Sequence, residues 1–212
     1  MREQKVSFPS RDGLMLEGLL YKGQQGRGKA ILCHPHPLYG GDMYSNVVGS
    51  LQDILAEGGF STLRFNFRGV GGSEGSYGEA AGELEDVRGA VDFIAAEMGH
   101  PVYLVGYSFG AYVGAKAVLG DERVKALVCI SPPIYFYDFT FLAWDERPKL
   151  LIAGDRDFVC PLKKLEEFSL TLAHPKFVHI IPGADHFWWG FEDPLAAQVM
   201  DFLRDLWPDR GP

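Results

Sequence analysis

Short apolar stretches recur along the chain, and longer stretches with apolar residues at every third or fourth position separate them. Short stretches that are apolar throughout are typical of strands buried on both faces, and the longer pattern is typical of helices that cover a sheet. We expect strands at 30–33, 61–65, 102–105, 126–130, 150–153 and 177–181. We expect helices at about 45–57, 80–98, 108–119, 162–171 and 195–207.

Two further strands, at 6–8 and 14–21, come first in the chain, and the turn 10–13 between them is typical of an antiparallel hairpin. Strands that alternate with helices form a parallel sheet, and right-handed crossovers place the helices on both of its faces. The sequence therefore predicts an α/β fold. We expect a mostly parallel central sheet of about eight strands, an N-terminal antiparallel hairpin and no separate lid domain.

Length, charge and cysteine content narrow the classes of protein. The chain has 212 residues, which is enough for one core, so we expect one domain spanning 1–212. The net charge is −8 without a cluster of Lys and Arg, so we expect no nucleic acid and no membrane as partner. Neither a signal-type segment nor a membrane-length apolar stretch is present, and three cysteines lack metal-type spacing. These features favour a cytoplasmic protein with free thiols.

The strongest chemical motif follows the strand at 102–105. It reads Gly-Tyr-Ser-Phe-Gly at 106–110 and leads directly into a predicted helix, a setting that lifts the Ser108 hydroxyl out of the backbone as a nucleophile. Residues 71–75 match the same Gly-x-Ser-x-Gly pattern. No strand leads into that second match and no helix leaves it, so we interpret Ser73 as part of a turn.

Serine is a weak nucleophile unless a base and an acid accompany it. The loop after the sixth expected strand of the parallel series carries His186, and the loop after the fifth carries Asp155 and Asp157. We favour Asp157 as the acid because Asp155 directly follows the turn glycine, where it can cap the turn. Asp185 is adjacent to His186 in sequence and is poorly placed to reach its ring.

Five other histidines compete for the role of base, and their positions argue against each of them. His34, His36 and His100 precede the serine, His174 stands before a proline at a helix end, and His179 falls within a strand. The sequence therefore predicts a catalytic group of Ser108, Asp157 and His186 in the chain order of nucleophile, acid and histidine.

Acyl transfer also needs two N–H donors for the oxyanion that develops on the substrate carbonyl. The backbone of Phe109, the residue after the nucleophile, supplies one of them. The second is expected from the loop that begins at residue 34, where prolines at positions 35 and 37 have no N–H. The choice there narrows to His36 or Leu38, and we expect the backbone N–H of His36.

Aromatic and apolar residues beside these positions are candidates for the substrate pocket. They are Leu38, Tyr39, Tyr107, Phe187 and Trp188, although packing near the site is the favoured explanation for the aromatic run that begins at 187. A second aromatic stretch at 134–144 is too short for an independent cap. It is expected either to line a groove or to form a contact between subunits, so the sequence leaves a monomer and a homodimer open.

Taken together, the motifs resemble those of the α/β-hydrolase superfamily, in particular its small bacterial lidless hydrolases and carboxylesterases. The resemblance covers most of the chain and rests on five motifs in order, at 34–43, 66–73, 106–110, 154–157 and 185–187. It implies that Ser108, Asp157 and His186 form a triad and that His36 and Phe109 supply the oxyanion donors. It implies neither a metal nor another cofactor.

We therefore expect a serine hydrolase that cleaves carboxylic esters or thioesters of small acyl groups through an acyl-enzyme. The expected partner is a small-molecule ester. Two alternatives remain at this stage: a peptidase or amidase of prolyl-peptidase-like type, and a non-catalytic binding protein that retains the hydrolase fold.

Overall fold

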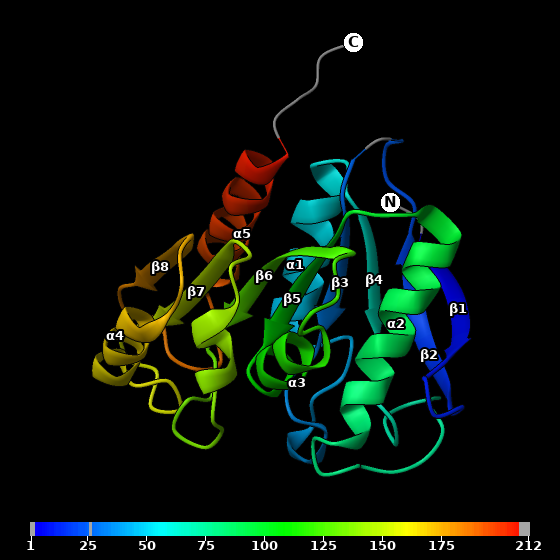
Figure 1. The fold of residues 1–212 in the computed structure, drawn as a ribbon, viewed down its shortest axis with the longest axis horizontal. Helices are drawn as coiled ribbons and strands as arrows, with labels where there is room; N and C mark the ends of the chain where they lie inside the picture. Colours follow the sequence, from blue (N-terminus) through cyan, green and yellow to red (C-terminus); the bar gives the residue numbers. More distant parts are fainter. Residues whose placement is uncertain (1–2, 26, 208–212) are drawn as a thin grey trace.

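One sheet runs through the molecule, and the helices pack against its two faces (Figure 1). The structure is a computed structural model that describes residues 3–25 and 27–207. The strands within these ranges are β1 (Gln4–Pro9), β2 (Met15–Tyr21), β3 (Lys29–Cys33), β4 (Ser61–Phe65), β5 (Val102–Tyr107), β6 (Val124–Ile130), β7 (Lys149–Gly154) and β8 (Lys176–Ile181). The α-helices are α1 (Asn46–Glu57), α2 (Gly82–Met98), α3 (Phe109–Ala117), α4 (Leu162–Thr171) and α5 (Glu192–Leu206).

The strand order is β1-β2-β4-β3-β5-β6-β7-β8. The hairpin strands β1 and β2 pair antiparallel, and β2 pairs antiparallel with β4. From β4 to β8 every neighbouring pair is parallel. The predicted fold class, including the N-terminal hairpin, is therefore confirmed.

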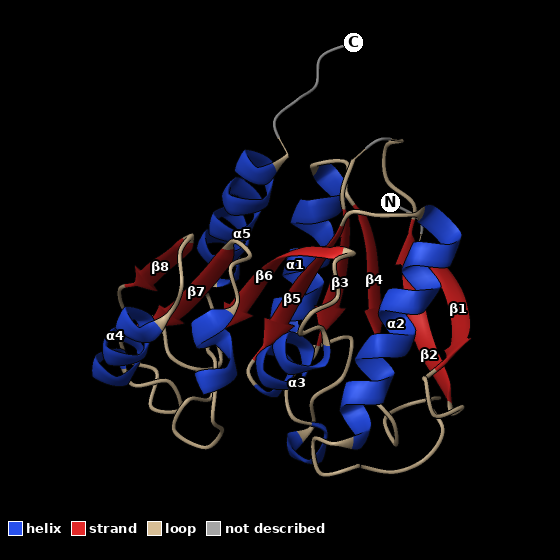
Figure 2. Cartoon of the chain, viewed as in Figure 1, coloured by secondary structure: helices blue, strands red, loops and turns tan. Residues whose placement is uncertain are grey.

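Both faces of the sheet are covered, and the central strands carry apolar side chains towards both of them. In β5, Val102 and Leu104 belong to the core on one face, and Tyr103 and Val105 belong to the core on the other. Helices α2, α3 and α4 pack on the first face, and α1 and α5 pack on the second (Figure 2). Among the described helices, none combines the length and apolar character needed to cross a membrane.

Element boundaries differ from the prediction where local backbone geometry overrides the apolar pattern. Helix α2 begins at Gly82 because Glu79 and Ala80 have positive φ values of 54° and 67°, outside the helical region. Helix α5 begins at Glu192, ahead of Pro194. A proline in the first helical turn removes only an N–H that has no partner within the helix.

The carboxyl ends of the parallel strands lie at one edge of the sheet, and their loops gather there. The loop after β3 contains a short 3-10 helix, Pro37–Tyr39, and the loop after β6 contains another, Thr140–Trp144. The second loop includes the aromatic stretch 134–144, in which Phe139 and Leu142 are buried while Tyr135 and Phe136 are exposed. It is an anchored loop and forms no separate cap.

Candidate active site

Ser108 stands between the end of β5 and the start of α3 with φ 53° and ψ −118°, a strained conformation for a residue with a side chain. Glycines on both sides allow this sharp turn. A Cβ on Gly106 would lie 2.3 Å from the carbonyl oxygen of Gly110, and a Cβ on Gly110 would lie 2.3 Å from that of Cys33. The motif therefore encodes a close approach between this turn and β3, and it presents the Ser108 hydroxyl at the carboxyl edge of the sheet.

The second match to the serine pattern has a structural role. The Ser73 hydroxyl donates to the carbonyl oxygen of Asn66 at 2.7 Å and accepts from the N–H of Glu17 at 2.9 Å. Both hydrogen-bonding functions of Ser73 are thus occupied by backbone groups. Its backbone forms a turn with Val70, as the sequence predicts.

His186 and Asp157 come from the loops after β8 and β7, and the structure brings both of them to Ser108. The Nε2 atom of His186 lies 3.0 Å from the Ser108 Oγ. Its Nδ1 atom lies 3.0 Å from each carboxylate oxygen of Asp157. An ionised carboxylate only accepts hydrogen bonds, so Nδ1 carries the imidazole proton and Nε2 is left to accept from the hydroxyl.

The surroundings of Asp157 keep it ionised. Burial alone would raise the pKa of Asp157, but hydrogen bonding and electrostatic attraction from His186, with further hydrogen bonds from Ser131 and Cys160, hold this pKa below its ordinary value. The N–H groups of Val159 and Cys160 donate to Oδ1 at 2.9 and 2.8 Å. A carboxylate held in this way fixes the orientation of a neighbouring imidazole and stabilises its protonated form.

The competing carboxylates have other partners. Asp155 accepts from the N–H of Gly183 at 2.7 Å and so joins the loops after β7 and β8. Asp185 accepts from the N–H groups of Phe187 and Trp188, at 2.9 and 3.2 Å, and thereby caps the turn that follows His186. In the described part of the chain, the carboxylate that hydrogen-bonds the imidazole of His186 is that of Asp157.

Hydrogen bonds and packing contacts of the imidazole rings fix the two histidines after β3. His34 is fully buried, accepts from the N–H of Phe67 at 3.0 Å and bonds the carbonyl oxygen of Pro35 at 2.7 Å. Burial lowers the pKa of His34 to about 4, so it stays neutral near pH 7. The His36 ring accepts the N–H of Leu38 at 3.2 Å and packs on Phe109 with ring centroids 4.7 Å apart.

These contacts separate the two candidates for the second oxyanion donor. The N–H of Leu38 is occupied by the His36 ring. In the described part of the chain, neither the N–H of His36 nor that of Phe109 donates to another protein group. Both remain available to a substrate oxygen, which favours His36 over Leu38.

The predicted pocket residues divide into two groups. Leu38, Tyr39 and Phe187 are exposed, and Phe187 lies edge-on to His186 with ring centroids 5.8 Å apart. Tyr107 is buried and donates through its hydroxyl to the carbonyl oxygen of His186 at 2.7 Å. Trp188 is 0% exposed and belongs to the core on the face of α1 and α5. We therefore correct the prediction for Tyr107 and Trp188, whose side chains support the loop instead of lining an open pocket.

Two residues near the site were missed in the sequence. Phe158 is 67% exposed and its ring lies 6.2 Å from that of His186. An apolar residue directly after the favoured acid was a signal for it. Ser131, the first residue after β6, is fully buried and accepts from the indole N–H of Trp188 at 2.9 Å. No sequence pattern marked it.

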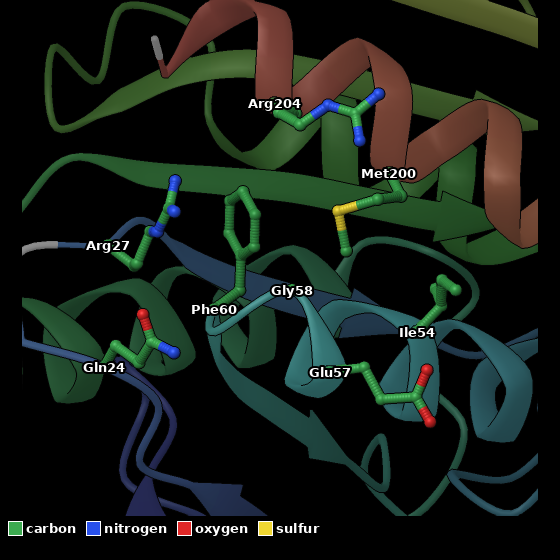
Figure 3. A pocket seen from close by; sticks show the side chains of 8 residues that line it. All are labelled: Gln24, Arg27, Ile54, Glu57, Gly58, Phe60, Met200 and Arg204. Carbon is green, nitrogen blue, oxygen red and sulfur yellow. The ribbon is translucent and has the colours of Figure 1, made fainter. Parts of the chain in front are cut away.

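A hollow of about 330 Å³ lies elsewhere, between the ends of α1 and α5 (Figure 3). Phe60, Met200 and Arg204 are among its lining residues, and no member of the Ser108 group contributes to it. It opens near the amino ends of the strands, away from the loops that carry Ser108, Asp157 and His186.

The sequence of this chain matches a known family model and several known proteins. The family model described as serine aminopeptidase, S33, matches residues 26–144, a range that includes Ser108 and ends before Asp157. An uncharacterised protein of Rickettsia prowazekii, RP471, is 34% identical over 184 residues, covering 82% of this chain and 77% of that protein. A thiohydrolase of Arthrinium phaeospermum, apmlB, is 32% identical over 167 residues, covering 73% of this chain and 50% of the thiohydrolase.

Solved structures share the whole architecture. The α/β-hydrolase-like protein ATU1826 of Agrobacterium tumefaciens is 34% identical, with 99% of each chain covered and a TM-score of 0.89. XC6422 of Xanthomonas campestris, described as an α/β serine hydrolase without lid, is 28% identical. It covers 100% of this chain and 98% of its own with a TM-score of 0.86. The similarity therefore extends over the fold and includes the lack of a lid.

Proposed function

The chain belongs to the α/β-hydrolase superfamily, and from this premise we propose that it is a serine hydrolase that cleaves carboxylic esters or thioesters of small acyl groups. The observation that carries the proposal is the continuous contact from Ser108 through His186 to Asp157, with 3.0 Å at each step. In this proposal Ser108 is the nucleophile, His186 the base and Asp157 the acid.

Acylation begins when the Ser108 Oγ attacks the substrate carbonyl carbon and passes its proton to the Nε2 of His186. Asp157 stabilises the imidazolium that results. The tetrahedral intermediate then collapses, the bond to the alcohol or thiol breaks, and His186 returns the proton to the leaving group. Water repeats the sequence on the acyl-enzyme and releases the acid with Ser108 restored.

The carbonyl oxygen becomes negative during both halves of the reaction. The free N–H groups of His36 and Phe109 supply the donors in this proposal, because they lie on either side of the close approach between the loop after β3 and the start of α3. Donors fixed in place before the substrate arrives stabilise the transition state without reorganisation, and each is worth roughly a hundredfold or more in turnover.

Exposed apolar side chains near His186 and His36 favour a substrate whose acyl or alcohol group is apolar. Phe158 and Phe187 pack around His186, and Tyr39 packs against the His36 ring with centroids 4.8 Å apart. Their exposed rings offer apolar surface on two sides of the nucleophile, and a substrate gains free energy by covering it.

Replacing the nucleophile tests the proposal. Ser108→Ala should lower kcat on a short-chain ester by roughly 10⁴-fold to 10⁶-fold, because the other members of a triad cannot replace the attacking oxygen. Steady-state turnover by the purified variant measures it. Ser73→Ala is the matched control and should keep wild-type turnover when folded. Wild-type-like activity in Ser108→Ala would contradict the proposal.

The relatives bear on the choice of substrate. The relative from Arthrinium phaeospermum is named a thiohydrolase and the matching family model is described as an aminopeptidase, so thioester and amide bonds are the bonds to compare with the ester. One acyl group offered as ester, thioester and amide decides between them. We expect high kcat/KM for the ester and thioester and low kcat/KM for the amide. Equal turnover of the amide would favour the peptidase alternative.

A further inference from the structure

A buried hydrogen-bonded chain continues behind Asp157. Ser131 is the first residue after β6, and Asp157 lies in the loop after the adjacent strand β7. The Ser131 hydroxyl accepts the indole N–H of Trp188 at 2.9 Å. The Ser131 hydroxyl also acts on the Asp157 carboxyl group, where hydrogen bonding lowers the pKa of Asp157. Ser131 and Trp188 are both fully buried, so this chain is shielded from water.

The chemistry of the three groups fixes the direction of these bonds. An indole N–H can only donate, so it occupies a lone pair of the Ser131 oxygen and leaves the hydroxyl proton free. An ionised carboxylate can only accept, so the hydroxyl proton goes to Asp157. The bonds therefore run in one sense, from Trp188 to Ser131 to Asp157. Without the indole, the hydroxyl would be free to rotate away from the carboxylate.

A hydrogen bond from Ser131 would complete the hydrogen bonding of Asp157. An ionised carboxylate offers about four lone-pair sites. The N–H groups of Val159 and Cys160 and the Nδ1–H of His186 supply three donors, and the Ser131 hydroxyl is the fourth group that acts on this carboxylate. A carboxylate with every site engaged has one orientation, and here that orientation presents both oxygens to His186.

The backbone holds both supporting residues in unusual conformations. Ser131 has φ 44° and Trp188 has φ 63°, both in the left-handed region that side chains disfavour. The Ser131 N–H is tied to the carbonyl oxygen of Ile152 at 2.7 Å, and the Trp188 N–H is capped by Asp185. Trp188 also stands only two residues after His186. The loop that carries the base is thus connected back to the acid through a buried indole and a buried hydroxyl.

We propose that Ser131 and Trp188 are positioning residues: the indole N–H orients the Ser131 hydroxyl, and the hydroxyl holds the Asp157 carboxylate against His186. The catalytic consequence of this arrangement rests on the proposed function, because it acts through the Ser108, His186 and Asp157 group. Neither side chain touches substrate, so both affect the rate of the chemical step and leave substrate binding unchanged.

Ser131→Ala is the first variant. The expected result is a fall in kcat of about tenfold, the loss typical of one hydrogen bond to a charged group, with KM unchanged. The acidic limb of the pH–rate profile should also move to higher pH, because a carboxylate with one donor fewer attracts the imidazolium more strongly. Unchanged kcat and an unchanged profile in a folded but less stable variant would overturn the proposal.

Two other titratable groups act electrostatically with Asp157. They are Cys160 and Tyr107, and burial raises the pKa of both. Both therefore stay neutral across the acidic limb, and a shift of that limb reports the Asp157–His186 pair.

Trp188→Phe tests the second link while the aromatic ring remains to fill the core. It should lower kcat by about threefold, and it should have no further effect in a protein that already carries Ser131→Ala. The exposed neighbour provides the control, since Trp189→Phe should match the wild type. Independent, fully additive effects of Ser131→Ala and Trp188→Phe on kcat would overturn the proposed order. If Ser131→Ala fails to fold, Trp188→Phe decides the question.

A readout without turnover separates this inference from the proposed function. The Nδ1–H proton of His186, hydrogen-bonded to Asp157, should give a downfield proton NMR resonance in the resting protein. This resonance should shift in Ser131→Ala and in Trp188→Phe but not in Trp189→Phe. An unshifted resonance overturns the inference even in an active enzyme. A shifted resonance in a protein that hydrolyses nothing supports the inference and contradicts the proposed function.

Discussion

Two histidines at the carboxyl edge of the sheet differ in what their ring nitrogens contact. Backbone groups occupy both nitrogens of His34, which is fully buried and neutral. The nitrogens of His186 face a hydroxyl and a carboxylate. A histidine between a potential nucleophile and an acid can exchange protons, whereas a histidine saturated by backbone groups serves the fold.

The neutral state of His34 predicts a loss of stability in acid. Burial lowers the pKa of His34 from its ordinary 6.5 to about 4, so between these values the unfolded chain binds a proton that the folded chain does not. This contribution is fully present above pH 6.5 and is lost as the pH falls towards 4, by up to about 3 kcal/mol. His34→Gln should therefore show a shallower fall in the free energy of unfolding between about pH 7 and 5.

Urea unfolding at a series of pH values measures this slope. His179→Gln is the control, because His179 is exposed and the substitution should leave the slope as in the wild type. Identical slopes for His34→Gln and the wild type would show that His34 does not carry the effect.

For single residues, the sequence predicted which loop each one occupies better than it predicted where the side chain points. The proximity of Ser108, Asp157 and His186 was predictable because each stands in a loop after a strand, and the order of the strands brings those loops together. Trp188 was misplaced because its positive φ turns the side chain into the core, and no apolar pattern reports a φ value. Ser131 was missed for the same reason.

At the scale of elements, the turn from β5 into α3 depends on how closely it approaches β3. A Cβ on Gly110 would meet the backbone of Cys33 at 2.3 Å and that of His34 at 2.6 Å. Backbone atoms in a central strand cannot move aside as a flexible side chain can. The glycine is therefore required for packing of the turn, independently of the chemistry at Ser108.

Gly110→Ala should lower the free energy of unfolding by about 3 kcal/mol or more, since overpacked sites that cannot relax lie at the upper end of the usual range. Gly49→Ala is the matched control within α1, where a Cβ would meet nothing within 4 Å. There the substitution should stabilise by about 0.5–1 kcal/mol through helix propensity. Urea unfolding compares the two, and equal stability of both variants would refute the steric account.

The predicted burial of the strands was most accurate where strands are central and least accurate at the margin of the sheet. The stretches that became β3 and β5 are apolar throughout and lie between other strands. The stretch at 177–181 was expected to be covered on both faces, yet β8 is an edge strand with exposed Phe177 and Val178. Apolar composition identified the strand but could not show how many neighbours it has.

At the scale of the whole molecule, Arg68 ties the N-terminal hairpin to the main body of the sheet. Its guanidinium lies 2.7 Å from Asp86 in α2 and 2.8 Å from Asp12 in the turn between β1 and β2. Asp86 is fully buried, whereas the Asp12 side chain is 44% exposed. Long-range contacts of this kind are invisible in the sequence, which predicted the hairpin but not how it attaches.

Asp86→Asn should destabilise the entire fold, because it leaves the buried guanidinium without its buried counter-charge, at a cost of about 3–5 kcal/mol. For a chain of this size that corresponds to a fall in Tm of roughly 10 °C. Asp12→Asn should cost less than about 1 kcal/mol, since water already screens that pair. Calorimetry of the two variants checks the order, and an equal or larger loss for Asp12→Asn would contradict it.

The intact mass of the protein after exposure to a fluorophosphonate reports whether Ser108 is an activated nucleophile. We predict one adduct on the wild type, one adduct on Ser73→Ala and none on Ser108→Ala, because among the described residues only Ser108 contacts a histidine held by a carboxylate. An unlabelled, folded wild type, or a label that persists in Ser108→Ala, would contradict an activated serine at this position. The unlabelled result would favour a binding protein that retains the hydrolase fold.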